Sequence, residues 1–254
     1  MEVVAPSPFP NLQRCAILLD VDGTIVDLAP TPREVWIPPS LRQVLSRLLQ
    51  RTDGAVALVS GRSVKDLDLI FAPLLLTTVG GHGAELRLVN HGERTATEAT
   101  PLDAALKRQL AAIGQAGPGI LVEDKGYSLA LHYRLAPQMQ QFIRSEVARI
   151  CAEASPNSIE ILPGKAVIEI KRAGFSKATG VRTLMTYPPF AGRQPIFIGD
   201  DTTDECVFEL MPELDGLAIS VGRKAPGVTS YFDTPGSVRA WLERLAEEEE
   251  KACS

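Results

Sequence analysis

Two acidic residues, Asp20 and Asp22, stand directly after the apolar run Cys15–Leu19, and Gly23 and Thr24 follow them. A short apolar run bounded by turn residues is typical of a buried strand in a parallel sheet. In open α/β sheets, ligands bind just beyond the carboxyl ends of the strands. The sequence therefore predicts that Asp20 lies where a reactive group would lie, with Asp22 facing the same pocket.

A second apolar run, residues 195–199, also ends in acids: Asp200, Asp201, Asp204 and Glu205. One Asp-Gly pair after one strand would indicate only a turn. Two acidic strand ends predict a site for Mg²⁺, which prefers carboxylate oxygens, water and phosphate. We expect Asp201 and Asp204 to support the metal site from outside its ligands. Glu205 can equally be an acid in the first turn of a helix, which the helix dipole favours.

Such a site suits the hydrolysis of a phosphate monoester, for which the barrier has to fall by roughly 20 kcal/mol or more. Asp20 is the candidate nucleophile and would form an aspartyl-phosphate. Asp22 is the candidate general acid and base. The side chains of Asp20 and Asp200, with the backbone carbonyl of Asp22, are the predicted ligands of a Mg²⁺ ion that neutralises the site and aligns the attack.

Further groups in the sequence could contact the phosphoryl group. Ser60 follows the apolar run 55–59 and offers a hydroxyl, and Gly61 offers a backbone N–H; a helix cap is the alternative for this stretch. Thr24 can add a donor beside Asp22. A lysine is needed to offset negative charge, and Lys177, which opens the helix before the second acidic strand, is the better candidate. Lys171, within a predicted strand, is the alternative.

The apolar periodicity predicts a doubly wound α/β core interrupted by an α+β insert. The core has expected strands over 15–20, 55–59, 76–79, 195–199 and 216–221, and expected helices over 39–49, 64–71, 176–185, 203–210 and 237–249. The insert has expected helices over 102–113 and 137–154 and expected strands over 120–125, 128–134, 158–162 and 166–171. We expect a discontinuous core of residues 1–103 and 174–254 and a cap of residues 104–173.

The composition limits the function classes. The chain has 254 residues, 45% hydrophobic content and a net charge of −5, which argue for a packed core and against nucleic-acid binding. Its four cysteines are scattered, so neither a metal motif nor a disulfide framework is expected. Neither a secretory signal nor a membrane-spanning stretch is apparent. We expect a cytoplasmic protein and a monomer.

The acidic motifs match a known pattern. Asp20-Val21-Asp22-Gly23-Thr24 resembles the DxDGT motif of the haloacid dehalogenase (HAD) superfamily phosphatases. Ser60, Lys177 and the stretch 199–205 are similar to the three remaining motifs, in the same order. One departure is Ala178, which follows the lysine where glycine is usual. The resemblance implies a Rossmann-like fold, Mg²⁺ dependence and, from the position of the insert, a C2B-type cap.

Within that superfamily, the sequence resembles the trehalose-6-phosphate phosphatases over the stretches 59–62, 81–85, 123–126 and 131–134. This resemblance implies the release of trehalose and phosphate from trehalose 6-phosphate, with a cap that closes over the sugar. The implied substrate-binding residues are Gly61 and Arg62 in the core and Glu123, Lys125, Arg134, Lys165 and Glu169 in the cap. Each of these cap residues, taken singly, can equally be a surface charge on a hairpin.

Other functions stay open at this point. The same chemistry could act on another sugar phosphate, such as sucrose phosphate or a glycosyl-phosphoglycerate. A non-catalytic sugar-phosphate sensor and a phosphomutase are further alternatives. His82 is either a substrate contact or a structural residue between core and cap. The expected partner is a small-molecule sugar phosphate, and a trehalose-phosphate synthase is a candidate protein partner.

Overall fold

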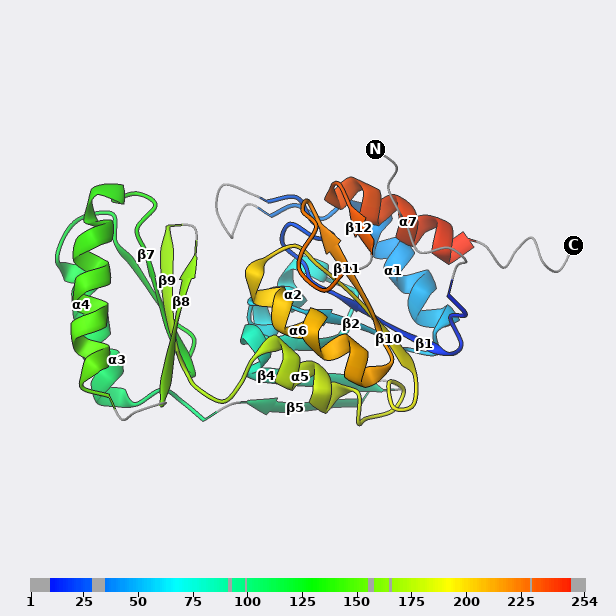
Figure 1. The fold of residues 1–254 in the computed structure, drawn as a ribbon, viewed down its shortest axis with the longest axis horizontal. Helices are drawn as coiled ribbons and strands as arrows, with labels where there is room; N and C mark the ends of the chain where they lie inside the picture. The colour runs from blue at the N-terminus through cyan, green and yellow to red at the C-terminus, as the bar shows by residue number, and fades with distance from the viewer. Residues whose placement is uncertain are drawn as a thin grey trace, which may run out of the picture. The chain divides into compact units, whose positions relative to one another are not determined.

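The computed structural model describes residues 10–28, 35–90, 93–98, 100–154, 158–164, 166–228 and 230–247 (Figure 1). The chain divides into two compact units. One consists of residues 1–98 and 176–254, which we call the core unit, and the other is residues 99–175, which we call the cap unit. The sequence prediction placed the boundaries of its core and cap at 103 and 174.

The core unit is built on an eight-stranded sheet in the described part of the chain, in the order β12-β11-β10-β1-β2-β3-β4-β5. Neighbouring strands from β12 to β3 are parallel, whereas β4 is antiparallel to both β3 and β5. The strands are β1 (Cys15–Leu19), β2 (Val56–Val59), β3 (Thr77–Gly80), β4 (Glu85–Asn90), β5 (Glu93–Glu98), β10 (Gln194–Gly199), β11 (Leu217–Val221) and β12 (Ser230–Phe232).

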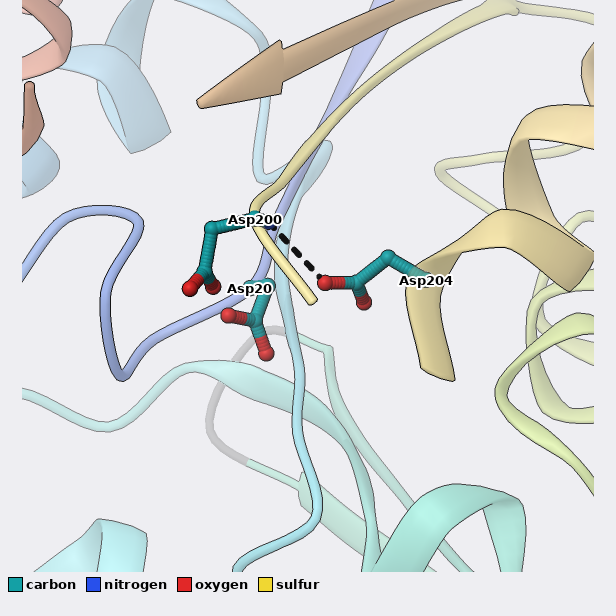
Figure 2. A group of neighbouring side chains, drawn as sticks. All are labelled: Asp20, Asp200 and Asp204. Atoms are coloured by element: carbon teal, nitrogen blue, oxygen red, sulfur yellow. Dashed lines mark hydrogen bonds between the residues drawn. The ribbon is translucent and has the colours of Figure 1, made fainter. Parts of the chain in front are cut away.

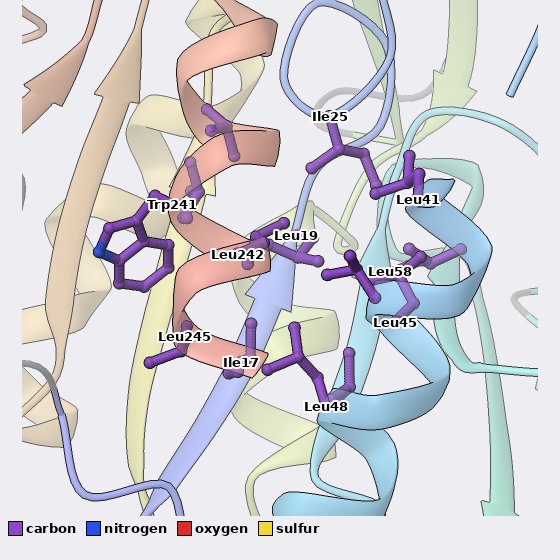
Figure 3. Packing of buried hydrophobic residues seen from close by; sticks show 14 of the residues in the cluster. Ile17, Leu19, Ile25, Leu41, Leu45, Leu48, Leu58, Trp241, Leu242 and Leu245 are labelled. Carbon is purple, nitrogen blue, oxygen red and sulfur yellow. The ribbon is translucent and has the colours of Figure 1, made fainter. Parts of the chain in front are cut away.

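Helices cover both faces of this sheet. They are α1 (Pro39–Arg51), α2 (Val64–Phe71), α5 (Lys177–Leu184), α6 (Glu205–Leu210) and α7 (Pro235–Glu247). On β1, Ile17 and Leu19 point to the face covered by α1 and α7 (Figure 3), and Leu18 belongs to the cluster on the other face, with α5 and α6. Every residue of β1 is buried. A strand covered on both faces is apolar throughout, which is why the run Cys15–Leu19 shows no alternation.

Side-chain caps fix where two of these helices begin. Ser63 accepts a hydrogen bond from the backbone N–H of Asp66 at 3.1 Å and caps α2. Ser176 accepts from the N–H of Thr179 at 3.2 Å, and the Thr179 hydroxyl accepts from the N–H of Ser176 in return at 2.8 Å. Such a capping box satisfies N–H groups that have no partner within a helix. It makes Lys177 the first residue of α5.

The cap unit has the predicted order αββαββ. It contains α3 (Ala104–Ala112), β6 (Leu121–Asp124), β7 (Ser128–His132), α4 (Gln140–Ala152), β8 (Ile159–Gly164) and β9 (Val167–Arg172). Its antiparallel sheet has the order β6-β7-β9-β8. Alternate residues such as Leu129, Leu131, Ile168 and Ile170 pack with apolar residues of α3 and α4. The residues between them, including the charged Glu169 and Lys171, therefore lie on the opposite face.

Three features differ from the sequence prediction. The hairpin β4–β5 and the strand β12 were not expected, because β5 is polar, Glu93–Glu98, and β12 has only three residues, too few for a pattern. Strand β8 continues through Pro163 to Gly164, where a loop was expected. It is an edge strand, where proline is tolerated because one side of the strand needs no hydrogen-bond donor.

Within the described residues, no helix is both long and apolar enough to cross a bilayer.

The packing between α1 and β1 can be tested by truncation. Leu45 of α1 is fully buried, so Leu45→Ala should lower the free energy of unfolding by about 2–5 kcal/mol. Leu69 of α2 is 71% exposed, so Leu69→Ala should change it by less than about 0.5 kcal/mol. Urea unfolding followed by circular dichroism measures both. Equal losses in the two variants would contradict the assignment of Leu45 to the core.

Candidate active site

Two parallel neighbouring strands bring the acids of the sequence motifs together. Strands β1 and β10 pair in register, with Leu19 beside Ile198, so their carboxyl ends lie at the same edge of the sheet. Asp20 and Asp200 follow directly, and Asp204 reaches in from the next turn (Figure 2). One carboxylate oxygen from each of the three lies within 4.8 Å of the others. The structure thus forms the acidic cluster that the two sequence motifs predicted.

Thr24 lies between two of these carboxylates. Its hydroxyl oxygen is 2.9 Å from Oδ2 of Asp20 and 3.0 Å from Oδ1 of Asp200. A hydroxyl has one proton, so it can donate to only one of the two acids at a time. The carboxylate oxygen that does not receive this proton would be available to a cation. The donor set consists of carboxylate oxygens, which suits a hard divalent ion such as Mg²⁺.

The electrostatics of the cluster also call for a cation. Burial raises the pKa of Asp20 well above its usual value, against the opposing influence of Lys177, and the neighbouring acids raise it further. Burial likewise raises the pKa of Asp200, although the hydrogen bond from Thr24 opposes this. Both shifts arise because a low dielectric disfavours charged groups. A bound divalent cation would reverse them.

Lys177 brings a positive charge into the acidic cluster. Its ammonium group donates to Oδ1 of Asp20 at 2.8 Å and to Oδ1 of Asp204 at 2.7 Å. Burial alone would lower the pKa of Lys177, but the two carboxylates outweigh it and raise that pKa above its ordinary value. Lys177 is therefore charged at neutral pH. Lys171, the alternative candidate, lies in the cap unit and pairs with Glu160 at 2.6 Å.

Asp204 fixes the loop that carries Asp200. It is fully buried, and its Oδ2 accepts the backbone N–H groups of Asp200 at 3.1 Å and Asp201 at 3.0 Å. With Oδ1 engaged by Lys177, both of its oxygens already have partners. Asp201 is exposed, and its carboxylate accepts the N–H of Thr202 at 2.7 Å. This contact caps the turn that follows Asp201. Asp204 and Asp201 thus shape the loop that carries Asp200.

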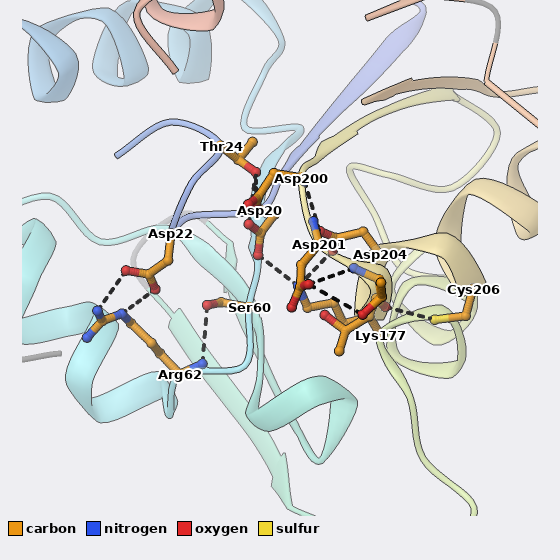
Figure 4. A network of polar contacts seen from close by, with 12 residues as sticks. Asp20, Asp22, Thr24, Ser60, Arg62, Lys177, Asp200, Asp201, Asp204 and Cys206 are labelled. Atoms are coloured by element: carbon orange, nitrogen blue, oxygen red, sulfur yellow. Dashed lines mark hydrogen bonds and ion pairs between the residues drawn. The ribbon is translucent and has the colours of Figure 1, made fainter. Parts of the chain in front are cut away.

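Asp22 forms a bidentate ion pair with Arg62. The Nε and Nη2 atoms of Arg62 donate to the Asp22 carboxylate at 2.5 and 2.7 Å, and Figure 4 shows this carboxylate turned toward the guanidinium. The backbone N–H of Arg62 donates to the hydroxyl of Ser60 at 3.2 Å, and Ser60 itself is buried. Arg62 was expected at the substrate from the resemblance. The structure shows it holding the candidate general acid and base.

Two glycines allow close approach at the site. Gly23 has φ +86°, and a Cβ there would lie 2.2 Å from Oδ2 of Asp200, so only glycine lets the loop after β1 pass the second acidic strand. A Cβ at Gly61 would lie 2.4 Å from Nε2 of His82. His82 therefore packs over Gly61 in the core unit.

The predicted cap residues lie in the cap unit, apart from Lys165, which falls outside the described residues. Glu169 accepts from Ser128 at 2.6 Å and from Lys125 at 3.2 Å. Glu123 lies 2.9 Å from Nε2 of His132. Arg134 is exposed in the loop after β7. The sequence motifs did not indicate a role for Ser128 or His132; the alternation along β7, which puts both side chains on one face, was the available signal.

Comparison with known proteins relates this chain to one group of enzymes. Residues 18–234 match the family model described as trehalose-phosphatase. The chain is 39% identical to a probable trehalose-phosphate phosphatase from Sinorhizobium fredii, over 89% of this chain and 85% of that protein. It is 35% identical to the trehalose-6-phosphate phosphatase of Escherichia coli, over 91% of this chain and 86% of that protein.

Solved structures show the same fold. The C-terminal domain of the Candida albicans trehalose-6-phosphate phosphatase superposes with a TM-score of 0.77 at 20% identity, over 92% of each chain. A phosphatase of the haloalkanoate (HAD) superfamily from Bacteroides thetaiotaomicron superposes with a TM-score of 0.62 at 14% identity, over 95% of this chain and 98% of that chain. These likenesses confirm the predicted α/β fold class.

The buried lysine can be tested by its effect on stability at two pH values. Lys177→Met leaves Asp20 and Asp204 without their shared cation, and breaking a buried ion pair costs about 3–5 kcal/mol. The pKa of Asp20 is already raised, so this acid takes up a proton as the pH falls and the repulsion is relieved. In metal-free buffer, Lys177→Met should lose more of its free energy of unfolding at about pH 8 than at about pH 5.5.

Urea unfolding at the two pH values measures this difference. The control is Arg47→Met, which removes an exposed ion pair with Glu247 in the same unit and should cost less than about 1 kcal/mol at either pH. A loss in Lys177→Met that is the same at both pH values would contradict the electrostatic account.

Proposed function

Because the chain belongs to the trehalose-phosphatase family, we propose that it hydrolyses trehalose 6-phosphate to trehalose and phosphate through an aspartyl-phosphate on Asp20. The chain is therefore a phosphatase. One observation carries the proposed mechanism: Asp20, Asp200 and Lys177 converge at the carboxyl edge of the core sheet, where Asp20 and Lys177 are buried and Asp200 is half-buried. This arrangement suits an anionic substrate only when a divalent cation is also bound.

Asp20 attacks phosphorus through a carboxylate oxygen, and the bond from phosphorus to the sugar oxygen breaks. Lys177 donates to Asp20, which orients the carboxylate and offsets negative charge as the phosphoryl group transfers. Side chains of Asp20 and Asp200, with the backbone carbonyl of Asp22, would hold Mg²⁺. When bound, the ion neutralises the phosphoryl oxygens and aligns the in-line attack. Ser60 and Gly61 offer further donors near the phosphoryl group, and Thr24 would do so if its hydroxyl turned away from the two acids.

Asp22 handles the protons. It gives a proton to the sugar oxygen as that oxygen leaves, and it then takes a proton from the water that attacks the aspartyl-phosphate. Water adds to phosphorus, the bond to Asp20 breaks, and inorganic phosphate is released. In the structure both oxygens of Asp22 accept from Arg62, so Asp22 has to turn away from Arg62 and take up a proton before it can give one to the sugar oxygen.

The cap unit would recognise the sugar. Charged groups suit sugar hydroxyls because charge-assisted hydrogen bonds are stronger than neutral ones. The proposed contacts are Glu123, Lys125, Arg134, Lys165 and Glu169. In the structure, both oxygens of Glu169 already accept from Ser128 and Lys125, so Glu169 is also suited to holding Lys125 in place.

A synthase is a candidate partner. The chain is 31% identical, over 94% of its own length, to a bifunctional trehalose-6-phosphate synthase/phosphatase from Thermoproteus tenax, and this match covers 33% of that protein. The phosphatase part of that protein is thus joined to a synthase in one chain. We propose that the present chain acts on the product of such a synthase.

The nucleophile is tested by an isosteric substitution. Asp20→Asn should reduce phosphate release from trehalose 6-phosphate by roughly a thousandfold or more, on the scale seen when an enzyme loses its nucleophile. Asp215→Asn, at an exposed turn of the same unit, is the matched control and should retain activity. Phosphate release across a panel that includes sucrose phosphate and a glycosyl-phosphoglycerate separates the alternatives. Full turnover by Asp20→Asn would rule out the aspartyl-phosphate.

The metal is tested by removal and by pH. EDTA should abolish activity and excess Mg²⁺ should restore it. Metal binding requires ionised carboxylates, and the pKa values of Asp20 and Asp200 are both raised. Protons should therefore compete with Mg²⁺ at a pH above the usual carboxyl range of about 4, and the half-saturating Mg²⁺ concentration should rise as the pH falls toward that range. An activity that EDTA leaves intact would contradict the metal role.

A further inference from the structure

Arg223 stands at the edge of the acidic cluster, and neither the sequence motifs nor the proposed mechanism uses it. It follows β11 after Gly222, whose φ of +71° turns the chain beyond the end of the strand. Strands β11 and β10 are parallel neighbours, with Gly199 beside Ser220. The turn that carries Arg223 therefore lies at the same carboxyl edge as the loop that carries Asp200.

The guanidinium of Arg223 makes two contacts with that loop. Its Nε donates to the backbone carbonyl of Asp200 at 3.2 Å, and its Nη2 donates to the carboxylate of Glu205 at 2.7 Å. The side chains of Arg223 and Glu205 are 38% and 34% exposed. An ion pair with this exposure contributes little to stability, about 0–1 kcal/mol. Its effect is therefore expected in the position of the loop rather than in the stability of the fold.

Asp200 is held on several sides. Its N–H donates to Asp204, its carbonyl accepts from Arg223, and one carboxylate oxygen accepts from Thr24. Arg223 contacts the main chain and not the carboxylate, so it fixes the residue without competing with a cation for the carboxylate oxygens. Glu205 balances the guanidinium charge, which would otherwise repel a cation at the cluster.

We propose that Arg223, together with Glu205, is a positioning residue that sets the divalent-cation affinity of the site by holding the main chain of Asp200. This inference rests on the proposed metal site. It gives Glu205 a role beyond that of an acid in the first turn of α6. Groups that orient metal ligands typically change metal affinity by about 10–100-fold when they are removed.

The experiment measures binding directly. Mg²⁺, and Mn²⁺ as a second probe, are titrated by calorimetry into the full chain and into Arg223→Ala. We expect the dissociation constant to rise by roughly tenfold or more. The half-saturating Mg²⁺ concentration for activity should rise by the same factor, while kcat and KM at saturating Mg²⁺ stay within about twofold and the urea midpoint is nearly unchanged. A merely structural role would move the urea midpoint instead.

The matched control is Arg182→Ala, which removes an exposed pair with Glu213 at 2.8 Å in the same unit and should leave cation affinity unchanged. Arg223→Lys keeps the charge but lacks the planar fork, so it should not restore affinity. Glu205→Gln should weaken binding, and its effect should not add to that of Arg223→Ala. Parental affinity in Arg223→Ala, or full affinity in Arg223→Lys, would overturn the positioning role.

The outcomes also separate this inference from the proposed function. If the parent chain binds Mg²⁺ and Arg223→Ala weakens that binding, but trehalose 6-phosphate is not hydrolysed, the positioning role stands and the substrate assignment fails. If the parent hydrolyses trehalose 6-phosphate and Arg223→Ala binds Mg²⁺ normally, the positioning role fails alone. If the parent binds neither cation, both fail.

Discussion

The site depends on the burial of negative charge at one edge of a sheet. Asp20 and Asp200 are brought side by side because β1 and β10 are parallel and in register. Burial raises the pKa values of both, and one hydroxyl, that of Thr24, is shared between them. Lys177 compensates part of this charge. The negative charge that Lys177 does not compensate makes the site suited to a divalent cation. A bound cation in turn offsets the negative charge of a phosphoryl group.

Most of the surrounding structure serves to hold these groups in place. The capping box of Ser176 sets the start of α5, and this start places Lys177 beside Asp20. Asp204 uses both carboxylate oxygens on Lys177 and on the N–H groups of the Asp200 loop. Residues that look alike in the motif therefore differ in task. Asp204 binds Lys177 and the backbone of the loop that it shapes, whereas Asp20 and Asp200 lie on either side of the single hydroxyl of Thr24.

The cap unit is organised by the same separation of faces as any antiparallel sheet. Its apolar face packs with α3 and α4, and its other face carries charged residues in pairs, such as Lys125 with Glu169. Pairing before any ligand arrives reduces the cost of ordering long side chains.

The sequence by itself determined the fold class, the family and the two acidic segments, and the comparisons and the structure confirmed these. Periodicity was sufficient because strands buried on both faces, such as Cys15–Leu19, are apolar throughout. It missed the hairpin β4–β5 because the polar strand β5 carries no such signal. Only the tertiary structure decided which charged group meets which. The pairs Arg62 with Asp22, Ser128 with Glu169 and Arg223 with Glu205 join residues on different elements, and their contacts depend on strand order and register, which local sequence does not encode.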